Sequence, residues 1–448
     1  LVGAEMCIRD RVTSANAAYS QTCWTIGTDG SIELNPERIV LPYSDHIEMS
    51  GEQVSCVLRW MVDEKGLFGQ ERSLVFPMLR RVPNDTHASL LYRMGTDVMS
   101  LVGINSLVPK QLSTKKVSID GGLSVISEYG VGKANVGGAR GDNPKPVAEV
   151  RTTVFPSKVH PMLCEIYSIR NISASPLALN VPKFSQEAKT LADKGVDGSY
   201  VIRADIFGSG AYVLEPWQEI GFQVAFQAYR EKGGSMIVPD FDAEYSARMS
   251  FIHDAIDSSL ILETPDTVIN TEFRFAKIRA SESIYRTKGG LMHGPGGESY
   301  YAALWCNDEC EYVNPFYPFL GYAVGNESAF NCYRLYSGFM NDDFKPVPSS
   351  IIAEGTDIWD GAGDRGDAAM IAHGLSRYLL ARGDKNEAEQ LWPFLKWCLE
   401  YCHRKLNAAG VPESDSDELE GRFPAGDANL STACLYYDGP VSYTHLRA

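Results

Sequence analysis

The spacing of apolar side chains changes near residue 265, and this change constrains the fold more than any other feature of the chain. Upstream of it, apolar residues recur at every second position, so Val54, Cys56, Leu58, Trp60 and Val62 fall on one face of an extended segment. Downstream, apolar residues recur every three or four positions, which is typical of one face of a helix. We therefore predict a multidomain fold in which a β domain precedes a helical domain.

The upstream part contains several short segments with this alternation. One such segment covers residues 220–229, and two others, 163–170 and 177–181, flank a turn at 171–175 and predict a β-hairpin. Many short strands with few helical stretches indicate a β-sandwich. We assign residues 13–264 to this domain.

The downstream part predicts helices joined by connections of alternating length. The helices are expected at about residues 271–287, 311–323, 326–340, 364–382, 384–406 and 427–439. Three long connections, which we name loop one (288–310), loop two (341–363) and loop three (407–426), alternate with short ones at Gly325 and Gly383. Every second connection of an up-and-down array lies at the same end, so the three loops should share one face. Functional residues often lie on such loops.

The three loops are rich in carboxylates and aromatic rings. These residues are Glu298, Tyr300, Tyr301, Trp305, Asp308 and Glu309 in loop one, Asp342, Asp343, Phe344, Glu354, Asp357, Trp359 and Asp360 in loop two, and Glu413, Asp415, Asp417, Glu418, Glu420 and Phe423 in loop three. Only Lys288, Lys345 and Arg422 oppose the negative charge. Carboxylates accept hydrogen bonds from hydroxyl groups, and rings present apolar faces to sugar C–H groups, so the shared face suits a neutral carbohydrate.

Other interpretations of these acids stay open at the level of sequence. A loop acid is often simply solvated, and Asp364 and Asp367 near a helix N-terminus would interact favourably with the helix dipole. Asp415, Asp417 and Glu420 supply oxygen ligands that could bind calcium. Glycoside hydrolysis, by contrast, generally needs a pair of carboxylic residues, and neighbouring negative charges help one of them stay protonated.

Charge and motifs argue against several classes of function. The chain has 41 basic and 57 acidic residues, a net charge of −16 at pH 7, and no basic stripe, so neither nucleic acid nor an anionic membrane surface is an expected partner. It has no run of 18 apolar residues, so no membrane insertion is predicted. The compartment stays open between cytoplasmic and periplasmic or secreted.

No metal and no other cofactor is predicted. The ten cysteines include no C-x-x-C motif, and no H-E-x-x-H motif is present. The segment 361–366 matches G-x-G-x-x-G, but it follows acidic residues rather than a hydrophobic strand, so we discount it as a nucleotide site. His293 and His373 are predicted to be structural.

Both ends of the chain resemble translated sequencing-adapter sequence. At the start this is Met6 to Arg11, and at the end it is VSYTHLRA, residues 441–448. We therefore expect residues 1–12 and 441–448 to be artefactual tails on a C-terminally truncated fragment from a metagenomic assembly.

Four segments resemble bacterial six-hairpin glycosidases, a superfamily of glycoside hydrolases with an (α/α)6 toroid. They read LMHGPGGESYYAALWCNDECEYVNPFYPFLGYA (291–323), ESDSDELEGRFPAGDANLST (413–432), LPYSDHIEMSGE (41–52) and RSLVFPMLRR (72–81). The resemblance implies an N-terminal β-supersandwich followed by a partial (α/α)6 toroid, with residues 265–440 forming its first half.

The resemblance also implies roles for residues of the loops. In glucoamylases and trehalases the general acid lies between the fifth and sixth helices, which corresponds to loop three, so Glu418 is the first candidate and Asp417 and Glu420 follow. A tryptophan–aspartate cluster in the first loop of these relatives holds the terminal sugar. The expected substrate-binding residues are Trp305, Asp308, Glu309, Tyr301, Trp359, Asp360 and Arg422.

The expected function is that of an inverting glycoside hydrolase. Its substrate is a carbohydrate whose sugar and linkage the sequence does not specify. The relatives take their catalytic base from near the end of the toroid, so we expect the base to lie beyond this fragment. A glycoside phosphorylase and a non-catalytic glycan-binding protein are the alternatives. A polysaccharide lyase is less favoured, because lyases of this architecture usually place the toroid first and act on acidic sugars.

Overall fold

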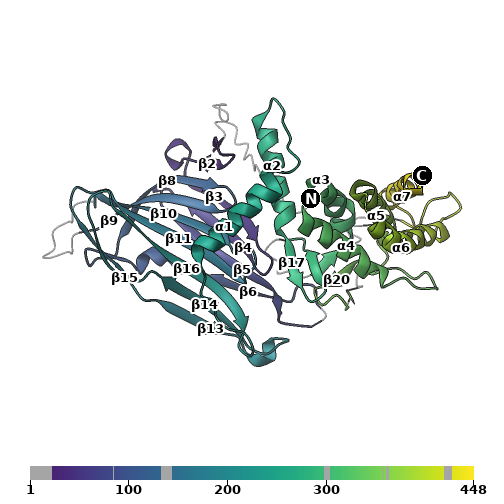
Figure 1. Cartoon of the computed structure of the whole chain (residues 1–448), viewed down its shortest axis with the longest axis horizontal. Helices are drawn as coiled ribbons and strands as arrows, with labels where there is room; N and C mark the ends of the chain where they lie inside the picture. The colour runs from purple at the N-terminus through teal and green to yellow at the C-terminus, as the bar shows by residue number, and fades with distance from the viewer. Residues whose placement is uncertain are drawn as a thin grey trace.

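The computed structural model describes residues 23–83, 85–132, 144–296, 303–356, 358–359, 363–417 and 426–447. It confirms the predicted order of a β domain followed by helices. Figure 1 shows the sheets, coloured purple to teal, on one side of the molecule and the helices, coloured green to yellow, on the other.

One layer of the β domain is a nine-stranded antiparallel sheet with the order β1-β2-β8-β9-β10-β11-β16-β14-β13. Its strands are β1 (Trp24–Ile26), β2 (Ile32–Leu34), β8 (Lys110–Ile119), β9 (Leu123–Gly130), β10 (Pro146–Pro156), β11 (Met162–Asn171), β16 (Glu219–Arg230), β14 (Tyr200–Phe207) and β13 (Ser185–Lys189).

The other layer consists of a four-stranded sheet, β3-β4-β5-β6, and a three-stranded sheet, β15-β12-β7. Their strands are β3 (Tyr43–Ser50), β4 (Ser55–Val62), β5 (Phe68–Arg80), β6 (Ser89–Met94), β15 (Gly210–Leu214), β12 (Leu177–Val181) and β7 (Gly103–Ile104). Apolar side chains from all three sheets form one continuous core, which makes the domain a β-sandwich.

The period-two alternation correctly predicts one buried face of β4, although Ser55 and Val57 on the opposite face are buried as well. The apolar set from Val54 to Val62 is at most 3 % exposed, while Arg59 and Met61 point outward. The alternation in β16 is less clean, because helix α1 (Phe241–Phe251) packs near the outer face of the sheet, where Phe241 and Ala225 belong to one apolar cluster. Both faces of the sheet are therefore buried there.

The predicted hairpin between 163–170 and 177–181 is wrong. β11 pairs with β10 and β16, whereas β12 pairs with β15 and β7 in the other layer. Buried Asn171 donates to the carbonyls of Ser175 and Leu214, each at 2.9 Å, where the chain crosses between layers. Alternating segments indicate strands, but they do not specify which strand pairs with which.

A helical segment joins the two parts of the molecule. α1 continues into a π-helix, η4 (Ile252–Asp257), and α2 (Thr267–Glu282) stands at the junction in Figure 1. The predicted domain boundary at residue 264 falls in the connection between η4 and α2. Five short strands follow, which are β17 (Ile284–Thr287), β18 (Gly290–His293), β19 (Ala303–Trp305), β20 (Ser350–Ile352) and β21 (Ile358–Trp359).

The remaining helices form part of a toroid of helical hairpins. They are the π-helix η5 (Asp308–Val313), α3 (Asn314–Leu320), α4 (Ala323–Ser337), α5 (Asp367–Arg382), α6 (Lys385–Arg404) and α7 (Leu430–Arg447). α5 contacts both α3 and α7 and is buried along most of its length, whereas α6 buries mainly one face. α3, α5 and α7 are therefore inner helices, and α4 and α6 are outer ones.

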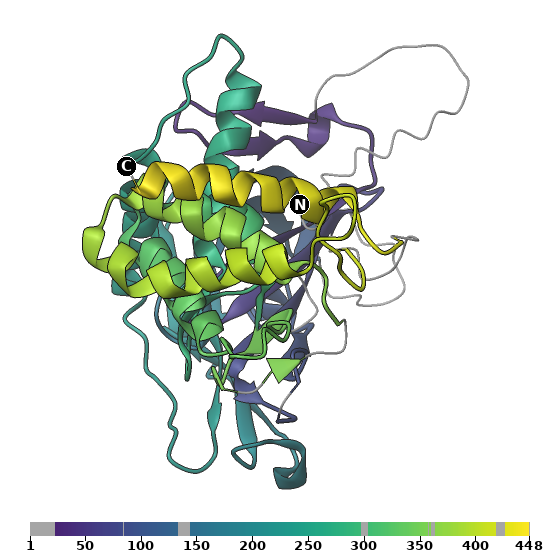
Figure 2. The same cartoon turned by 90° about the vertical axis from the view of Figure 1, so that its right-hand side faces the viewer.

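Figure 2 shows α5, α6 and α7 lying side by side, with the short α5–α6 turn at one end and the long connection after α6 at the other. Several details of the prediction differ. The helix expected at 271–287 ends at Glu282, and its last predicted residues form β17 instead. Gly325 lies inside α4, and the short connection is at Gly321, whose positive φ of 65° ends α3. The residues predicted as one helix from 311 begin as a π-helix.

α7 includes most of the residues expected to form a C-terminal tail. It extends to Arg447, and Tyr443 stacks on Trp392 of α6 with ring centroids 4.7 Å apart. The corresponding N-terminal residues, 1–12, lie outside the described part of the chain. Along the described residues, no helix combines the length and the apolar character needed to cross a membrane.

Candidate functional site

The ends of the three loops meet at one end of the helical array. β19 of loop one pairs with β20 of loop two, and the Cys306 amide donates to the Ser349 carbonyl at 2.9 Å. In loop three, the Asp415 amide donates to the Asp364 carbonyl at 2.8 Å. Backbone hydrogen bonds thus connect loop one to loop two and loop three to Asp364, the residue that directly follows loop two, in agreement with the alternating connection lengths.

Asp364 holds loop three against the start of α5. Its amide donates to Asp415 Oδ2 (3.0 Å), and its own Oδ1 accepts from the Gly366 amide (2.9 Å). Its Oδ2 accepts from the Tyr401 hydroxyl (2.5 Å) and pairs with Lys405 Nζ (3.4 Å), both at the end of α6. The buried Asp364 carboxylate therefore has a structural role in this arrangement.

Arg365 and Asp367 form a buried ion pair that reaches loop one. Arg365 Nη2 lies 3.2 Å from Asp367 Oδ1 and donates to Asn307 Oδ1 at 3.4 Å, and the Ser349 hydroxyl donates to Asp367 Oδ2 at 3.3 Å. Burial raises the pKa of Asp367, and the positive charge of Arg365 opposes that shift. This pair positions the residues that follow Cys306.

Asp308, an expected sugar-binding residue, is half-buried at the start of η5. Burial raises the pKa of its carboxyl, and the positive charges of His293 and Arg365 partly oppose this. A carboxyl group in such surroundings can accept hydrogen bonds when ionised and donate one when protonated.

Glu309, also an expected sugar-binding residue, points into the core instead. It is fully buried, its Oε1 lies 3.2 Å from His293 Nδ1, and its Oε2 has no hydrogen-bond partner among the described residues. Burial raises the pKa of Glu309, and the hydrogen bond to His293 opposes this shift. The structure places Glu309 in the core beside His293 rather than on the surface of the shared face.

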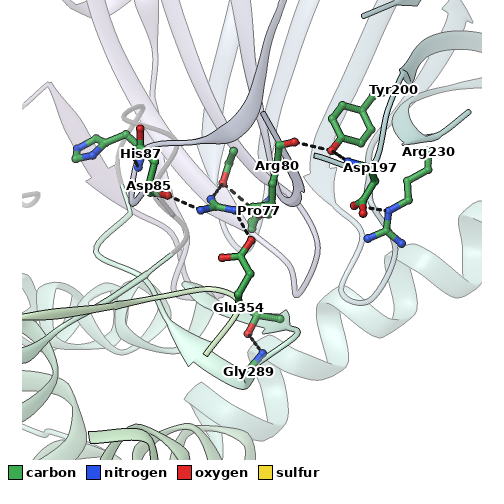
Figure 3. A network of polar contacts seen from close by, with 11 residues as sticks. Pro77, Arg80, Asp85, His87, Asp197, Tyr200, Arg230, Gly289 and Glu354 are labelled. Carbon is green, nitrogen blue, oxygen red and sulfur yellow. Dashed lines mark hydrogen bonds and ion pairs between the residues drawn. The ribbon is translucent and has the colours of Figure 1, made fainter. Parts of the chain in front are cut away.

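Trp305 is 9 % exposed and lies where the helical domain meets the sandwich. The ring of His87, from the connection between β5 and β6, approaches it edge-on with centroids 6.1 Å apart. Figure 3 shows the neighbouring contact, in which Glu354 of loop two points toward Arg80 at the end of β5. Sequence reasoning did not identify His87 or Arg80 as parts of this region, because neither lies near the loops in the chain.

Several expected site residues cannot be placed. Tyr301, Asp360, Glu418, Glu420 and Arg422 lie outside the described residues, and only the backbone of Trp359 is described. Asp417 is the last described residue before the segment that holds Glu418, and its carbonyl accepts a hydrogen bond from the Ser416 hydroxyl (3.3 Å).

Other polar groups near this region have structural partners. His373 Nδ1 lies 2.8 Å from Asp438 Oδ2, which joins α5 to α7. The buried thiols of Cys306 and Cys310 lie 3.9 Å apart. Within the described part of the chain, no group of three or more His, Cys, Asp or Glu side chains has an arrangement that could hold a metal ion.

Asp308→Asn is expected to leave the fold at least as stable at pH 7. A raised pKa means that the contribution of Asp308 to stability is present below its ordinary pKa of about 3.9 and is lost as the pH rises through the folded value. The neutral amide avoids that loss, so the melting temperature at pH 7 should equal or exceed that of the wild type. The difference should disappear near pH 3.

Differential scanning calorimetry across this pH range tests the prediction. Asp343→Asn is the matched control, because this loop-two carboxylate has a side chain that is 74 % exposed. Its melting temperature should stay close to that of the wild type at each pH. A melting temperature for Asp308→Asn well below that of the wild type at pH 7 would contradict the assigned effect of burial.

No protein-family model and no curated protein sequence matches the chain. Among solved structures, it is similar to a protein described as a kojibiose phosphorylase from the human microbiome, with a TM-score of 0.48 and 10 % identity. That match covers 87 % of this chain and 61 % of the phosphorylase chain. Another similar structure is a bacterial glucoamylase complexed with acarbose, with a TM-score of 0.33 and 8 % identity, covering 86 % of this chain and 72 % of the glucoamylase chain.

Proposed function

We propose that this protein is a carbohydrate-active enzyme, and specifically an inverting glycoside hydrolase that uses carboxylate general acid/base catalysis on a neutral glycan. The observation that carries the proposal is the meeting of the three loops at one end of the helices. This end combines the indole of Trp305, the half-buried carboxyl of Asp308 and the residues immediately before the acidic segment 418–420. Rings and carboxyl groups are the groups that sugar binding and glycoside cleavage require.

Glu418 is the proposed general acid, with Asp417 and Glu420 as alternatives. The hydrogen bonds between Asp415 and Asp364 support this assignment, because they hold loop three beside loop two only a few residues before Glu418.

Trp305 and Asp308 are the proposed contacts to the bound sugar, whereas Glu309 is buried beside His293 and is not proposed to touch the sugar. The other proposed substrate-binding residues are Tyr301, Trp359, Asp360 and Arg422.

Hydrolysis is favoured over phosphorolysis because two cations at this end already have carboxylate partners. Arg365 pairs with Asp367 and Lys405 pairs with Asp364. A phosphorylase needs positive charge that is available to phosphate, whereas a hydrolase needs only water as the acceptor.

A panel of 4-nitrophenyl α- and β-glycosides and neutral disaccharides, assayed with and without inorganic phosphate, tests the function. We expect free sugar to be released at a rate that does not depend on phosphate. NMR of the first product should show an anomeric configuration opposite to that of the substrate. Formation of a sugar 1-phosphate would instead identify a phosphorylase. Binding measured by calorimetry without any cleavage would identify a glycan-binding protein.

Trp305→Ala is expected to lower kcat/KM on the best substrate of the panel by about tenfold or more, because a stacked ring contributes on the order of 1 kcal/mol beyond the area it buries. Trp217→Ala, at a 63 % exposed tryptophan of the sandwich, is the matched control and should leave kcat/KM unchanged. Equal activity in both variants would remove Trp305 from the proposed site.

A further inference from the structure

His87, in the connection between β5 and β6, is a residue of the sandwich that contacts Trp305. His87 is exposed, and its ring stands at 80° to the indole with centroids 6.1 Å apart. Its orientation is held locally, because its amide donates to Asp85 Oδ1 (2.8 Å) and its Nδ1 lies 2.7 Å from Thr86 Oγ1. An imidazole with a defined orientation thus lies beside the proposed sugar-stacking ring.

Arg80 fixes the base of this connection. It is fully buried, its Nη2 donates to the Asp85 carbonyl, and its Nη1 donates to Ser89 Oγ at 3.4 Å. Its own carbonyl accepts from the Tyr200 hydroxyl at 2.5 Å. Asp85 within the connection and Ser89 directly after it are therefore tied to one buried guanidinium, and Figure 3 shows the contact with Asp85.

The same guanidinium ties the connection to loop two. Arg80 Nε lies 3.1 Å from Glu354 Oε1, and Glu354 follows β20 closely in the chain. Because β20 pairs with β19, the strand that ends at Trp305, this ion pair joins the connection to the small sheet that carries the indole. The Gly289 amide, which donates to the Ala353 carbonyl at 3.0 Å, holds this part of loop two from below.

These contacts form a closed path from Trp305 through β19, β20, Glu354, Arg80 and Asp85 to His87. Such a path fixes the distance between the indole, which belongs to the helical domain, and the imidazole, which belongs to the sandwich. The small exposed part of the indole beside an exposed imidazole suits a pyranose, because sugar C–H groups can contact that part of the indole while a hydroxyl group hydrogen-bonds to the imidazole.

We propose that the β-sandwich forms one wall of the glycan site and that His87 is a specificity-determining residue for the sugar bound at Trp305. This inference rests on the proposed function. His87 distinguishes sugars by the direction of a hydroxyl group, because a hydrogen bond made by one epimer is lost in the other.

His87→Ala tests the proposal with 4-nitrophenyl glucosides, mannosides and galactosides, which differ in configuration at C2 or C4. We expect KM for the preferred sugar to rise about 3- to 10-fold, the size of one lost hydrogen bond, while kcat changes by less than about twofold. The ratio of kcat/KM between the preferred sugar and its epimers should fall by a similar factor.

Two further variants separate this role from a structural one. His87→Gln keeps a hydrogen-bonding group and should recover part of the selectivity, and His253→Ala, at a histidine that is 74 % exposed on η4, should match the wild type. Melting temperatures of all variants should be equal, since His87 is exposed.

An active wild type whose KM and epimer selectivity are unchanged in His87→Ala would overturn this inference and leave the proposed function standing. A wild type that neither binds nor cleaves any glycan of the panel would overturn both. A loss of kcat alone, with KM and selectivity unchanged, would also overturn the proposal, because it would show that His87 does not recognise the sugar.

Discussion

Glu418→Gln is expected to slow the cleavage of glycosides with poor leaving groups by about 10²- to 10⁴-fold, the usual contribution of a general acid. Glutamine has nearly the shape of glutamic acid but does not donate a proton to the leaving oxygen. Glycosides of 2,4-dinitrophenol need no such proton, so their cleavage should fall much less. The measurement compares kcat/KM for a 4-methoxyphenyl and a 2,4-dinitrophenyl glycoside of the preferred sugar.

Glu413→Gln is the matched control for this experiment. Glu413 is an exposed carboxylate in the same loop, and its amide donates to the Lys405 carbonyl at 2.9 Å. The control should behave as the wild type with both substrates. If Glu418→Gln loses activity equally on both, the residue is not the proton donor. If it loses none, the general acid is Asp417, Glu420 or a residue of loop one.

Glu165→Leu is expected to lower the free energy of unfolding by about 3–5 kcal/mol, the usual cost of leaving one partner of a buried ion pair alone. Glu165 on β11 faces Arg72 on β5, so the pair joins the two layers of the sandwich. Arg72 Nη2 lies 2.9 Å from Glu165 Oε2, and the Tyr167 hydroxyl donates to the same oxygen at 2.7 Å. Both charged side chains are at most 2 % exposed. Urea unfolding followed by circular dichroism measures the change.

Two controls show whether the loss comes from the unpaired charge. Arg72→Met combined with Glu165→Leu removes both charges and should recover much of the lost stability, because apolar replacement of a whole buried pair is often neutral. Glu71→Ala breaks a surface pair, in which Arg93 Nε lies 3.9 Å away, and should change stability by less than about 1 kcal/mol. A double variant as unstable as Glu165→Leu would indicate that packing, not the unpaired Arg72 charge, causes the loss.

The sequence predicts local structure well where one element alone determines it. The alternation from Val54 to Val62 correctly identifies the buried face of β4, and the change of period near residue 265 correctly predicts the order of the two parts. The alternating lengths of the connections correctly bring the ends of three loops together. Each of these predictions needs only the period of one segment or the direction of neighbouring helices.

Predictions that depend on a partner elsewhere in the chain are less successful. The hairpin expected at 163–181 does not form, because β12 has its partners in the other layer of the sandwich. Glu309 is an acidic residue of the kind expected in a sugar-binding loop, but a π-helix turns its side chain toward His293 in the core. Composition and spacing do not specify such orientations.

The sequence by itself determined the order of the two parts, a buried face of β4, and the end of the helices at which the long connections meet. These follow from hydrophobic periodicity and connection length, which are properties of residues close together in the chain. Only the tertiary structure decided that Arg80 binds Glu354 and that His87 lies beside Trp305. Those contacts join residues that lie more than 200 positions apart in the sequence. They form because the sandwich packs against the loops, and no local pattern encodes that packing.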